Sequence, residues 1–308
     1  MKQEITIVTA FFRINRAEMK GFERTDEQYF EYFKGWAKLK NMIVVYVETD
    51  ELKNRILEFR DSLGLKDKTI VNVVDNCFEL DSELYNAMEI ATNNPIQQLY
   101  RIRPNNPDAS NAKYNYVQLL KTLCVKDAVD REQAKGMVAW MDFGYNHGWS
   151  TFTPDSDFNY TWEFDFPDKI NVSAIQKPDD RPIYDIIFSM DTYIMGGGII
   201  APDGLWGELW NLLRESMIAL CSCGLCDDDQ NLLLMAYRKK PEIFKLWYMG
   251  WSMQLYEFGG KEHLILREHR DSALKNIAKD IWHGFQLRKE CARYVISIFS
   301  HLLKYPPK

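Results

Sequence analysis

The feature that most constrains the fold of this chain is an alternation of short apolar runs with longer segments of helical spacing. The apolar runs, rich in β-branched residues, lie at 5–12, 42–47, 69–74 and 138–141. Segments with helical spacing lie between them, at 25–39, 51–63, 81–91 and 112–128. Strands that alternate with helices form a mostly parallel sheet that helices cover on both faces. The first half of the chain therefore predicts a Rossmann-like α/β fold.

Local signals predict where two of these helices begin and end. Thr25 followed by Gln28 three positions later is a capping box, which marks a helix N-terminus. Gly64 directly follows the segment 51–63 and predicts its C-terminal stop.

The second half has a different pattern. Residues 145–185 are rich in aromatic residues, Asp and Pro, which indicates short strands and loops. Helical spacing returns at 205–220, 227–239 and 273–303. Because no clear linker separates the halves, we expect one domain, 1–308, with two lobes, 1–145 and 146–308, and a helical C-terminal region.

Composition and charge exclude several classes of protein. The chain has 38 Lys and Arg against 44 Asp and Glu, a net charge of −6. Nucleic-acid binding is not expected, because a protein that coats a duplex needs surplus positive charge. No apolar run reaches the roughly eighteen residues of a membrane-spanning helix. The apolar stretch 5–12 is too short and polar for a signal peptide. We therefore expect a cytoplasmic protein with reduced cysteines.

The strongest local feature is the sequence Trp-Met-Asp-Phe-Gly-Tyr at 140–145. An apolar strand ends there in Asp142, which places a carboxylate at the edge of the sheet where ligands bind. Mg²⁺ commonly uses one or two protein carboxylates together with phosphate oxygens. Asp142 is therefore a candidate anchor for a metal-bound diphosphate. A turn Asp that caps the next segment would produce the same pattern.

Two runs of three identical residues follow in the second half. Gly196, Gly197 and Gly198 remove every Cβ along a short stretch, which lets a ligand approach the backbone closely. A flexible turn explains the same triplet, and no dinucleotide or P-loop motif is present. The run 227–229 is Asp-Asp-Asp at a helix start. One or two of these residues suffice as a cap, so another is available to orient or deprotonate an acceptor hydroxyl.

Several single residues are candidates for contacts with a nucleotide or a metal. Arg16, just past the first strand, has the fork that grips phosphate. Asn115 and Lys121 lie on the helix before the fourth strand, within reach of a nucleotide. His147 and His283 are candidates to complete a metal site. Each residue also has a structural interpretation, as a solvated Arg or a packed His.

Two further segments have competing interpretations. Cys221, Cys223 and Cys226 are spaced like a metal knuckle, but no second pair of cysteines supplies four zinc ligands. Small thiols at a helix end explain them better. Residues 288–304 mix Lys and Arg with apolar residues, which fits either a peripheral membrane contact or a packing helix. The ordinary apolar face favours packing.

Taken together, residues 7–12 with Arg16, the 140–144 segment, the glycine triplet and 228–231 resemble the WlaTC/HtrL glycosyltransferase family, also called HtrL/YibB. The likeness runs from the first strand to about Trp251. It implies a GT-A-like fold, with a nucleotide-binding lobe at 1–145 and an acceptor-binding lobe at 146–308. It also implies work on bacterial lipooligosaccharide or surface polysaccharide.

The resemblance, together with the positions of Asn115, Lys121 and His283 noted above, assigns roles to particular residues. The donor nucleotide sugar would contact Thr9, Ala10, Phe11, Phe12, Arg16, Asn115, Lys121, Asp142, Gly196, Gly197 and Gly198. Asp142 would replace the metal-binding Asp-x-Asp motif and hold Mn²⁺ or Mg²⁺, with His283 as a further ligand. Asp228 or Asp229 would face the acceptor as the catalytic carboxylate. The second Asp of the motif is absent, so an enzyme without the cation would use Arg16 or Lys121 to neutralise the diphosphate.

The expected activity is that of a hexosyltransferase. It would move a hexose from a nucleotide diphosphate sugar, of which a UDP-sugar is the first choice, to a glycan or glycolipid acceptor. The expected location is the cytoplasm, including the inner face of the inner membrane. The alternative is a non-catalytic protein that binds nucleotide sugars or carbohydrates on the same fold. Inversion and retention both stay open.

Overall fold

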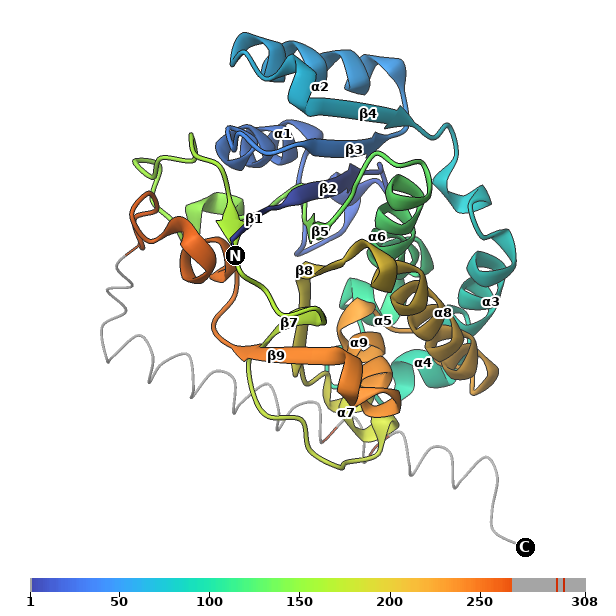
Figure 1. Cartoon of the computed structure of the whole chain (residues 1–308). Coiled ribbons are helices and arrows are strands. Elements are labelled where there is room, and N and C mark those ends of the chain that lie inside the picture. Colours follow the sequence, from blue (N-terminus) through green and yellow to red (C-terminus); the bar gives the residue numbers. More distant parts are fainter. Residues whose placement is uncertain (1, 268–291, 293–295, 297–308) are drawn as a thin grey trace, which may run out of the picture.

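The computed structural model describes residues 2–267, 292 and 296 (Figure 1). Within these residues, seven strands form one sheet in the order β4-β3-β2-β5-β8-β7-β9. They are β2 (Thr6–Phe11), β3 (Ile43–Val47), β4 (Thr69–Val73), β5 (Met137–Met141), β7 (Ile170–Ala174), β8 (Ile194–Pro202) and β9 (Phe244–Tyr248). The short strands β1 (Gln3–Glu4) and β6 (Glu163–Phe164) pair separately. Strands from both halves of the chain thus share one continuous sheet.

The sheet is mostly parallel, as the sequence predicts. β2 is parallel to β3 and β5, β3 to β4, and β7 to β9, whereas β8 is antiparallel to both β5 and β7. The chain passes from β2 to β3 on one side and later returns to β5 on the other side. The strand order therefore reverses between β2 and β5. Open α/β sheets bind ligands at such a reversal, beyond the carboxyl ends of the strands.

Helices cover both faces of this sheet, which confirms the α/β prediction (Figure 1). One face packs against α1 (Asp26–Trp36) and α2 (Asp50–Ser62). The opposite face packs against α3 (Ser82–Thr92), α6 (Ala112–Asp130), α7 (Ile183–Ser189), α8 (Trp206–Ser222) and α9 (Asp229–Lys239). The short helices α4 (Pro95–Leu99) and α5 (Pro107–Ser110) precede α6.

The two-residue periodicity of the strands separates two apolar cores. Val8 and Trp140 belong to the core beneath α3, α6 and α8, whereas their neighbours Ile7 and Met141 belong to the core beneath α1 and α2. Successive strand residues point to opposite faces, so a sheet covered twice needs an apolar residue at nearly every position. This explains why the strands are continuous apolar runs.

Both predicted helix-end signals are confirmed. The Thr25 hydroxyl accepts a hydrogen bond from the Gln28 backbone N–H at 3.3 Å, and the Gln28 side chain accepts one from the Thr25 N–H at 2.8 Å. Gly64 follows the end of α2 with a φ of +70°, a conformation that glycine adopts without a steric penalty.

The glycine triplet is the main departure from the predicted elements. Gly196, Gly197 and Gly198 lie inside β8 and do not form a turn. The pairing of β8 with β7 jumps from Met195 to Ile199, so the three glycines form an irregularity within the strand. Bulges of this kind often lie next to active sites. The predicted helix at 273–303 lies outside the described residues, apart from residues 292 and 296. Among the described residues, no helix has the length and apolarity to cross a membrane.

Candidate functional site

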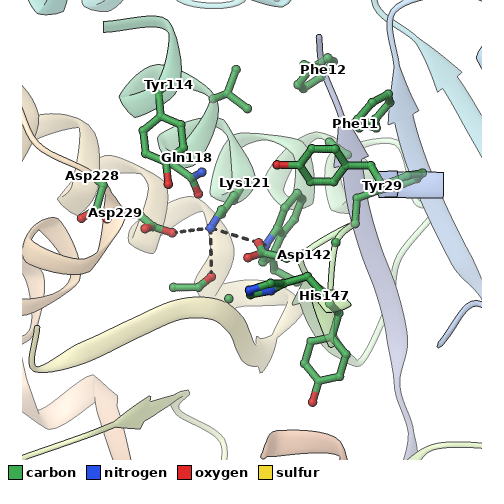
Figure 2. A pocket seen from close by; sticks show the side chains of 18 of the residues that line it. Phe11, Phe12, Tyr29, Tyr114, Gln118, Lys121, Asp142, His147, Asp228 and Asp229 are labelled. Atoms are coloured by element: carbon green, nitrogen blue, oxygen red, sulfur yellow. Dashed lines mark hydrogen bonds and ion pairs between the residues drawn. The ribbon is translucent and has the colours of Figure 1, made fainter. Parts of the chain in front are cut away.

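A cavity of about 320 Å³ opens at the reversal of strand order, beyond the ends of β2 and β5 (Figure 2). One side, called here the β2–β5 wall, consists of Ala10, Phe11, Phe12, Asp142, Phe143 and Gly144. The other side, the β8–α9 wall, consists of Gly196, Gly197, Asp228 and Asp229. Lys121 reaches the cavity from α6, between the two walls.

Asp142 lies at the edge of the sheet and faces this cavity. Phe143, the next residue, anchors it by stacking on Phe33 at 4.4 Å and on Phe11 at 4.9 Å between ring centroids. The Asp142 Oδ1 atom accepts a hydrogen bond from Trp140 Nε1 at 2.8 Å. The Asp142 side chain is 39% exposed, so its carboxylate is accessible to a ligand.

Lys121 links the two walls. Its ammonium lies 2.8 Å from Asp229 Oδ2, 3.1 Å from Asp142 Oδ1 and 3.4 Å from the Gly196 carbonyl oxygen (Figure 2). Burial by itself would lower the pKa of Lys121, but the carboxylates of Asp142 and Asp229 outweigh this effect and raise it. Lys121 is therefore a permanent buried cation at the centre of the site.

The three consecutive Asp residues have three different environments. Asp227 forms a buried ion pair with Arg101 at 3.0 Å and serves the structure. Asp228 caps α9 and accepts hydrogen bonds from the backbone and the side chain of Gln230, at 3.0 and 2.7 Å. Asp229 pairs with Lys121. The run thus exceeds the needs of a cap, as the sequence predicts.

Burial and neighbouring carboxyl groups alter the acidity of this pair. Desolvation, together with the nearby Asp108 and Asp229, raises the pKa of Asp228 well above that of an ordinary carboxyl. Burial also raises the pKa of Asp229, although the Lys121 ammonium opposes the shift. Asp229 contacts a cation, whereas Asp228 has no cation at salt-bridge distance within the part of the chain that the structure describes. Asp228 is therefore the carboxyl better suited to hold and transfer a proton.

The glycine triplet makes room for polar side chains of the site. A Cβ on Gly196 would lie 1.9 Å from Asp229 Oδ2, and one on Gly197 would lie 3.3 Å from Asp142 Oδ2. A Cβ on Gly198 would lie 3.2 Å from the side-chain amide of Gln254. The absence of these Cβ atoms leaves space for the side chains of Asp229, Asp142 and Gln254. Of the three glycines, only Gly196 and Gly197 line the cavity.

Cationic and aromatic side chains surround the entrance. The Arg16 guanidinium lies 4.7 Å from the centre of the Tyr114 ring, and Arg24 lines the same cavity. Tyr29 faces the cavity beside Phe11 and Phe12 (Figure 2). Guanidinium groups next to aromatic rings match the phosphates and the base of a nucleotide.

Several predicted contact residues lie away from the cavity. Thr9 is fully buried, and among the described residues its hydroxyl has no hydrogen-bond partner. Asn115 is also fully buried, because its amide donates to the Asp108 carbonyl at 2.8 Å. Gly198 lies beneath Gln254. None of these three residues lines the cavity, and their roles toward a ligand stay predictions. His283 lies outside the described residues.

Other lining residues were missed by the sequence reasoning. Tyr114 and Gln118 line the cavity from α6, next to the predicted Lys121. Their spacing of four and three places them on one face of a helix, so this signal was available once Lys121 was chosen. Trp251 and Gln254 also line the cavity, from an irregular segment that has no periodic signal.

The chemistry of the site restricts how a divalent cation fits. The described residues contain no cluster of three His, Cys, Asp or Glu side chains suited to hold a metal ion. Asp142 Oδ1 already contacts Lys121 and Trp140, which leaves Oδ2 as the carboxylate oxygen for a cation. Mg²⁺ accepts so few protein ligands where substrate phosphates and water supply the others. A cation at Asp142 would therefore need most of its ligands from bound phosphate and water.

The fold and site define an α/β protein with a polar, partly buried cavity at the carboxyl edge of a mostly parallel sheet. Residues 3–258 match the model of a family described as a bacterial protein of unknown function, HtrL_YibB. The chain is also similar to Protein HtrL of Escherichia coli strain K12, with 30% identity over 270 residues that cover 81% of this chain and 90% of that protein. The chain thus belongs to the HtrL/YibB family, as its sequence motifs predict.

Proposed function

We propose that this protein is a glycosyltransferase of GT-A-like fold that uses a nucleotide diphosphate sugar as donor. It moves a hexose to a glycan or glycolipid acceptor in the synthesis of bacterial lipooligosaccharide or surface polysaccharide. The observation that carries the proposal is the cavity at the reversal of strand order, where Lys121 joins an accessible carboxylate, Asp142, to the buried pair Asp228 and Asp229.

The β2–β5 wall is the proposed donor side. The aromatic rings of Phe11, Phe12 and Tyr29 would flank the base, and Arg16 would grip the diphosphate. Asp142 would hold Mn²⁺ or Mg²⁺ through Oδ2. The cation, when bound, would neutralise negative charge on the leaving diphosphate.

The β8–α9 wall is the proposed acceptor side. An acceptor hydroxyl oxygen attacks C1 of the donor hexose, the bond from C1 to the diphosphate oxygen breaks, and its electron pair leaves with the nucleotide. In an inverting reaction the ionised Asp228 accepts the hydroxyl proton, while Asp229 stays paired with Lys121. In a retaining reaction the same carboxylate would instead stabilise positive charge on the sugar.

The test is a titration of UDP with and without Mn²⁺ on the wild type and on Asp142→Ala. We expect Mn²⁺ to strengthen UDP binding to the wild type, and we expect this gain to fall by about tenfold or more in the variant. Asp155→Ala is the matched control, because Asp155 is exposed and does not line the cavity. A full metal effect that survives in Asp142→Ala would remove Asp142 from this role.

The second candidate is a non-catalytic protein that binds nucleotide sugars or carbohydrates. The observation in its favour is that Lys121 and Trp140 already contact one oxygen of the Asp142 carboxylate. Incubation with a panel of nucleotide sugars and candidate acceptors separates the two functions. Release of free nucleotide supports the transferase, and tight binding without any release supports the binder.

We also propose that the protein works in the cytoplasm, close to the membrane that carries a lipid-linked acceptor. The segment 288–304, which would make the peripheral contact, lies outside the described residues, apart from residues 292 and 296.

A further inference from the structure

The segment 250–254 forms part of the cavity entrance and is held in a fixed conformation. Ser252 has a φ of +56°, which is uncommon for a residue with a side chain. The Tyr145 hydroxyl donates a hydrogen bond to the Ser252 carbonyl, and the Thr151 hydroxyl donates one to the Trp251 carbonyl at 3.4 Å. These contacts stabilise the positive φ of Ser252, which is unfavourable on its own.

This conformation presents a large aromatic side chain at the entrance. Trp251 lines the cavity and is 51% exposed. Most large aromatic residues of this chain are packed in its two cores. A tryptophan that is held open at a cavity entrance offers a flat apolar surface with one N–H donor to a ligand.

Gln254 supplies a second, independent observation. It also lines the cavity, but only 3% of the residue is exposed, and among the described residues its amide oxygen has no hydrogen-bond partner. Buried polar atoms of folded proteins are nearly always hydrogen-bonded. The missing Cβ of Gly198 provides the space that this side chain occupies. The amide oxygen is thus placed to accept a hydrogen bond from a ligand.

We propose that residues 251–254 form the subsite for the acceptor sugar, which rests on the function proposed above. The Trp251 ring packs against the apolar face of a pyranose, and the Gln254 amide oxygen accepts a hydrogen bond from one of its hydroxyl groups. The Trp251 ring and the Gln254 amide are both uncharged, so these two side chains offer no ion pair to an anionic ring. The acceptor unit is therefore a neutral, hydroxyl-rich sugar.

The experiment measures binding of methyl glycosides of glucose and galactose to the full chain by saturation-transfer NMR, in the presence of UDP and Mn²⁺. Trp251→Ala and Gln254→Met are the test variants. Tyr184→Ala, which removes an aromatic ring that is 52% exposed away from the cavity, is the control. Affinity of each variant for UDP is measured in parallel.

We expect saturation transfer to the methyl glycosides from both the wild type and the control variant. Trp251→Ala should weaken sugar binding about fivefold or more, and Gln254→Met should weaken it without a change in the affinity for UDP. The subsite is overturned if the wild type binds neither methyl glycoside, or if both variants bind them as the wild type does. An equal loss of sugar and UDP binding in the variants also overturns it.

Methyl glucuronide and methyl glucoside together test the charge preference. The neutral sugar should bind more tightly, and a preference for the anionic one would contradict the assignment. Failure of the proposed function has a different signature. In that case UDP does not bind or no nucleotide sugar is consumed, whereas the sugar still binds beside Trp251.

Discussion

The two walls of the cavity hold their carboxyl groups in opposite ways. Asp142 on the β2–β5 wall is 39% exposed, because it follows the end of a strand and faces the cavity. Asp228 and Asp229 on the β8–α9 wall are almost fully buried, and burial raises the pKa of both. The β2–β5 wall therefore offers a carboxylate that a cation can reach. The β8–α9 wall holds its carboxyl groups in a desolvated environment.

The difference teaches how the two proposed tasks are separated. Binding a cation and a diphosphate requires an accessible, ionised carboxylate. Accepting a proton near neutral pH requires a carboxyl whose pKa lies above the ordinary range. Lys121 contacts Asp142 on one wall and Asp229 on the other, so it couples the two environments. Variants of Lys121 and its partners therefore test the comparison directly.

The largest effect is expected for Lys121→Met. This change removes the buried cation between the walls and leaves Asp229 without its partner. Loss of one member of a buried ion pair typically costs about 3–5 kcal/mol. We expect the free energy of unfolding, measured by urea denaturation, to fall by that order. The control is Lys126→Met on the same helix, because Lys126 makes a more exposed pair with Asp130.

The double variant Lys121→Met/Asp229→Asn sharpens this test. It removes both charges, so it should recover a large part of the stability that Lys121→Met loses. If Lys121→Met alone costs less than about 1 kcal/mol, or if the second change adds a further loss, the buried pair does not join the walls as described.

The next effect is expected for Gly196→Ala. The added Cβ would meet Asp229 Oδ2 at 1.9 Å, so the carboxylate or the strand must move. Overpacking of this kind costs about 1–3 kcal/mol, and the displaced Asp229 would lose its contact with Lys121. Gly204→Ala is the control, since nothing lies within 4 Å of its Cβ position. Equal stability of the two variants would contradict the proposed role of the triplet.

Most of the fold was accessible from the sequence. The continuous apolar runs that became β2, β3, β4 and β5 are produced by burial on both faces, and this is a local signal. The capping box at Thr25 and the stop at Gly64 are also local. The antiparallel direction of β8 is not local, because strand direction depends on pairing between distant segments.

The candidate site was accessible only in part. Asp142 follows a readable strand, and the Asp run exceeds what a helix cap needs, so both walls had a sequence signal. Thr9 and Asn115 lie away from the cavity lining for a common reason. Each lies within an element that does reach the site, but the sequence does not specify how each side chain is rotated relative to the cavity. Gln254 was missed because it enters the cavity from an irregular segment.

The smallest effect is expected for Asp228→Asn, and its sign depends on pH. The pKa of Asp228 is raised in the folded protein and ordinary in the unfolded chain. The unfolded chain therefore releases this proton at lower pH than the folded protein does, and the free energy of unfolding falls as pH rises through the interval between the two values. The Asn variant lacks this loss but keeps an oxygen that can accept the hydrogen bond from the Gln230 N–H.

We therefore expect Asp228→Asn to be more stable than the wild type at pH 7, by an amount on the order of 1 kcal/mol, with little difference near pH 3. The measurement is urea denaturation at both pH values, with Asp155→Asn as the control because that carboxyl is exposed. The same variant should lose sugar transfer, since a base with a buried, raised pKa is what the reaction would use. A variant that is less stable at pH 7 than at pH 3, relative to the wild type, would mean that the charged form of Asp228 stabilises the fold and that its pKa is lowered, not raised. The contrast between the two walls would then disappear.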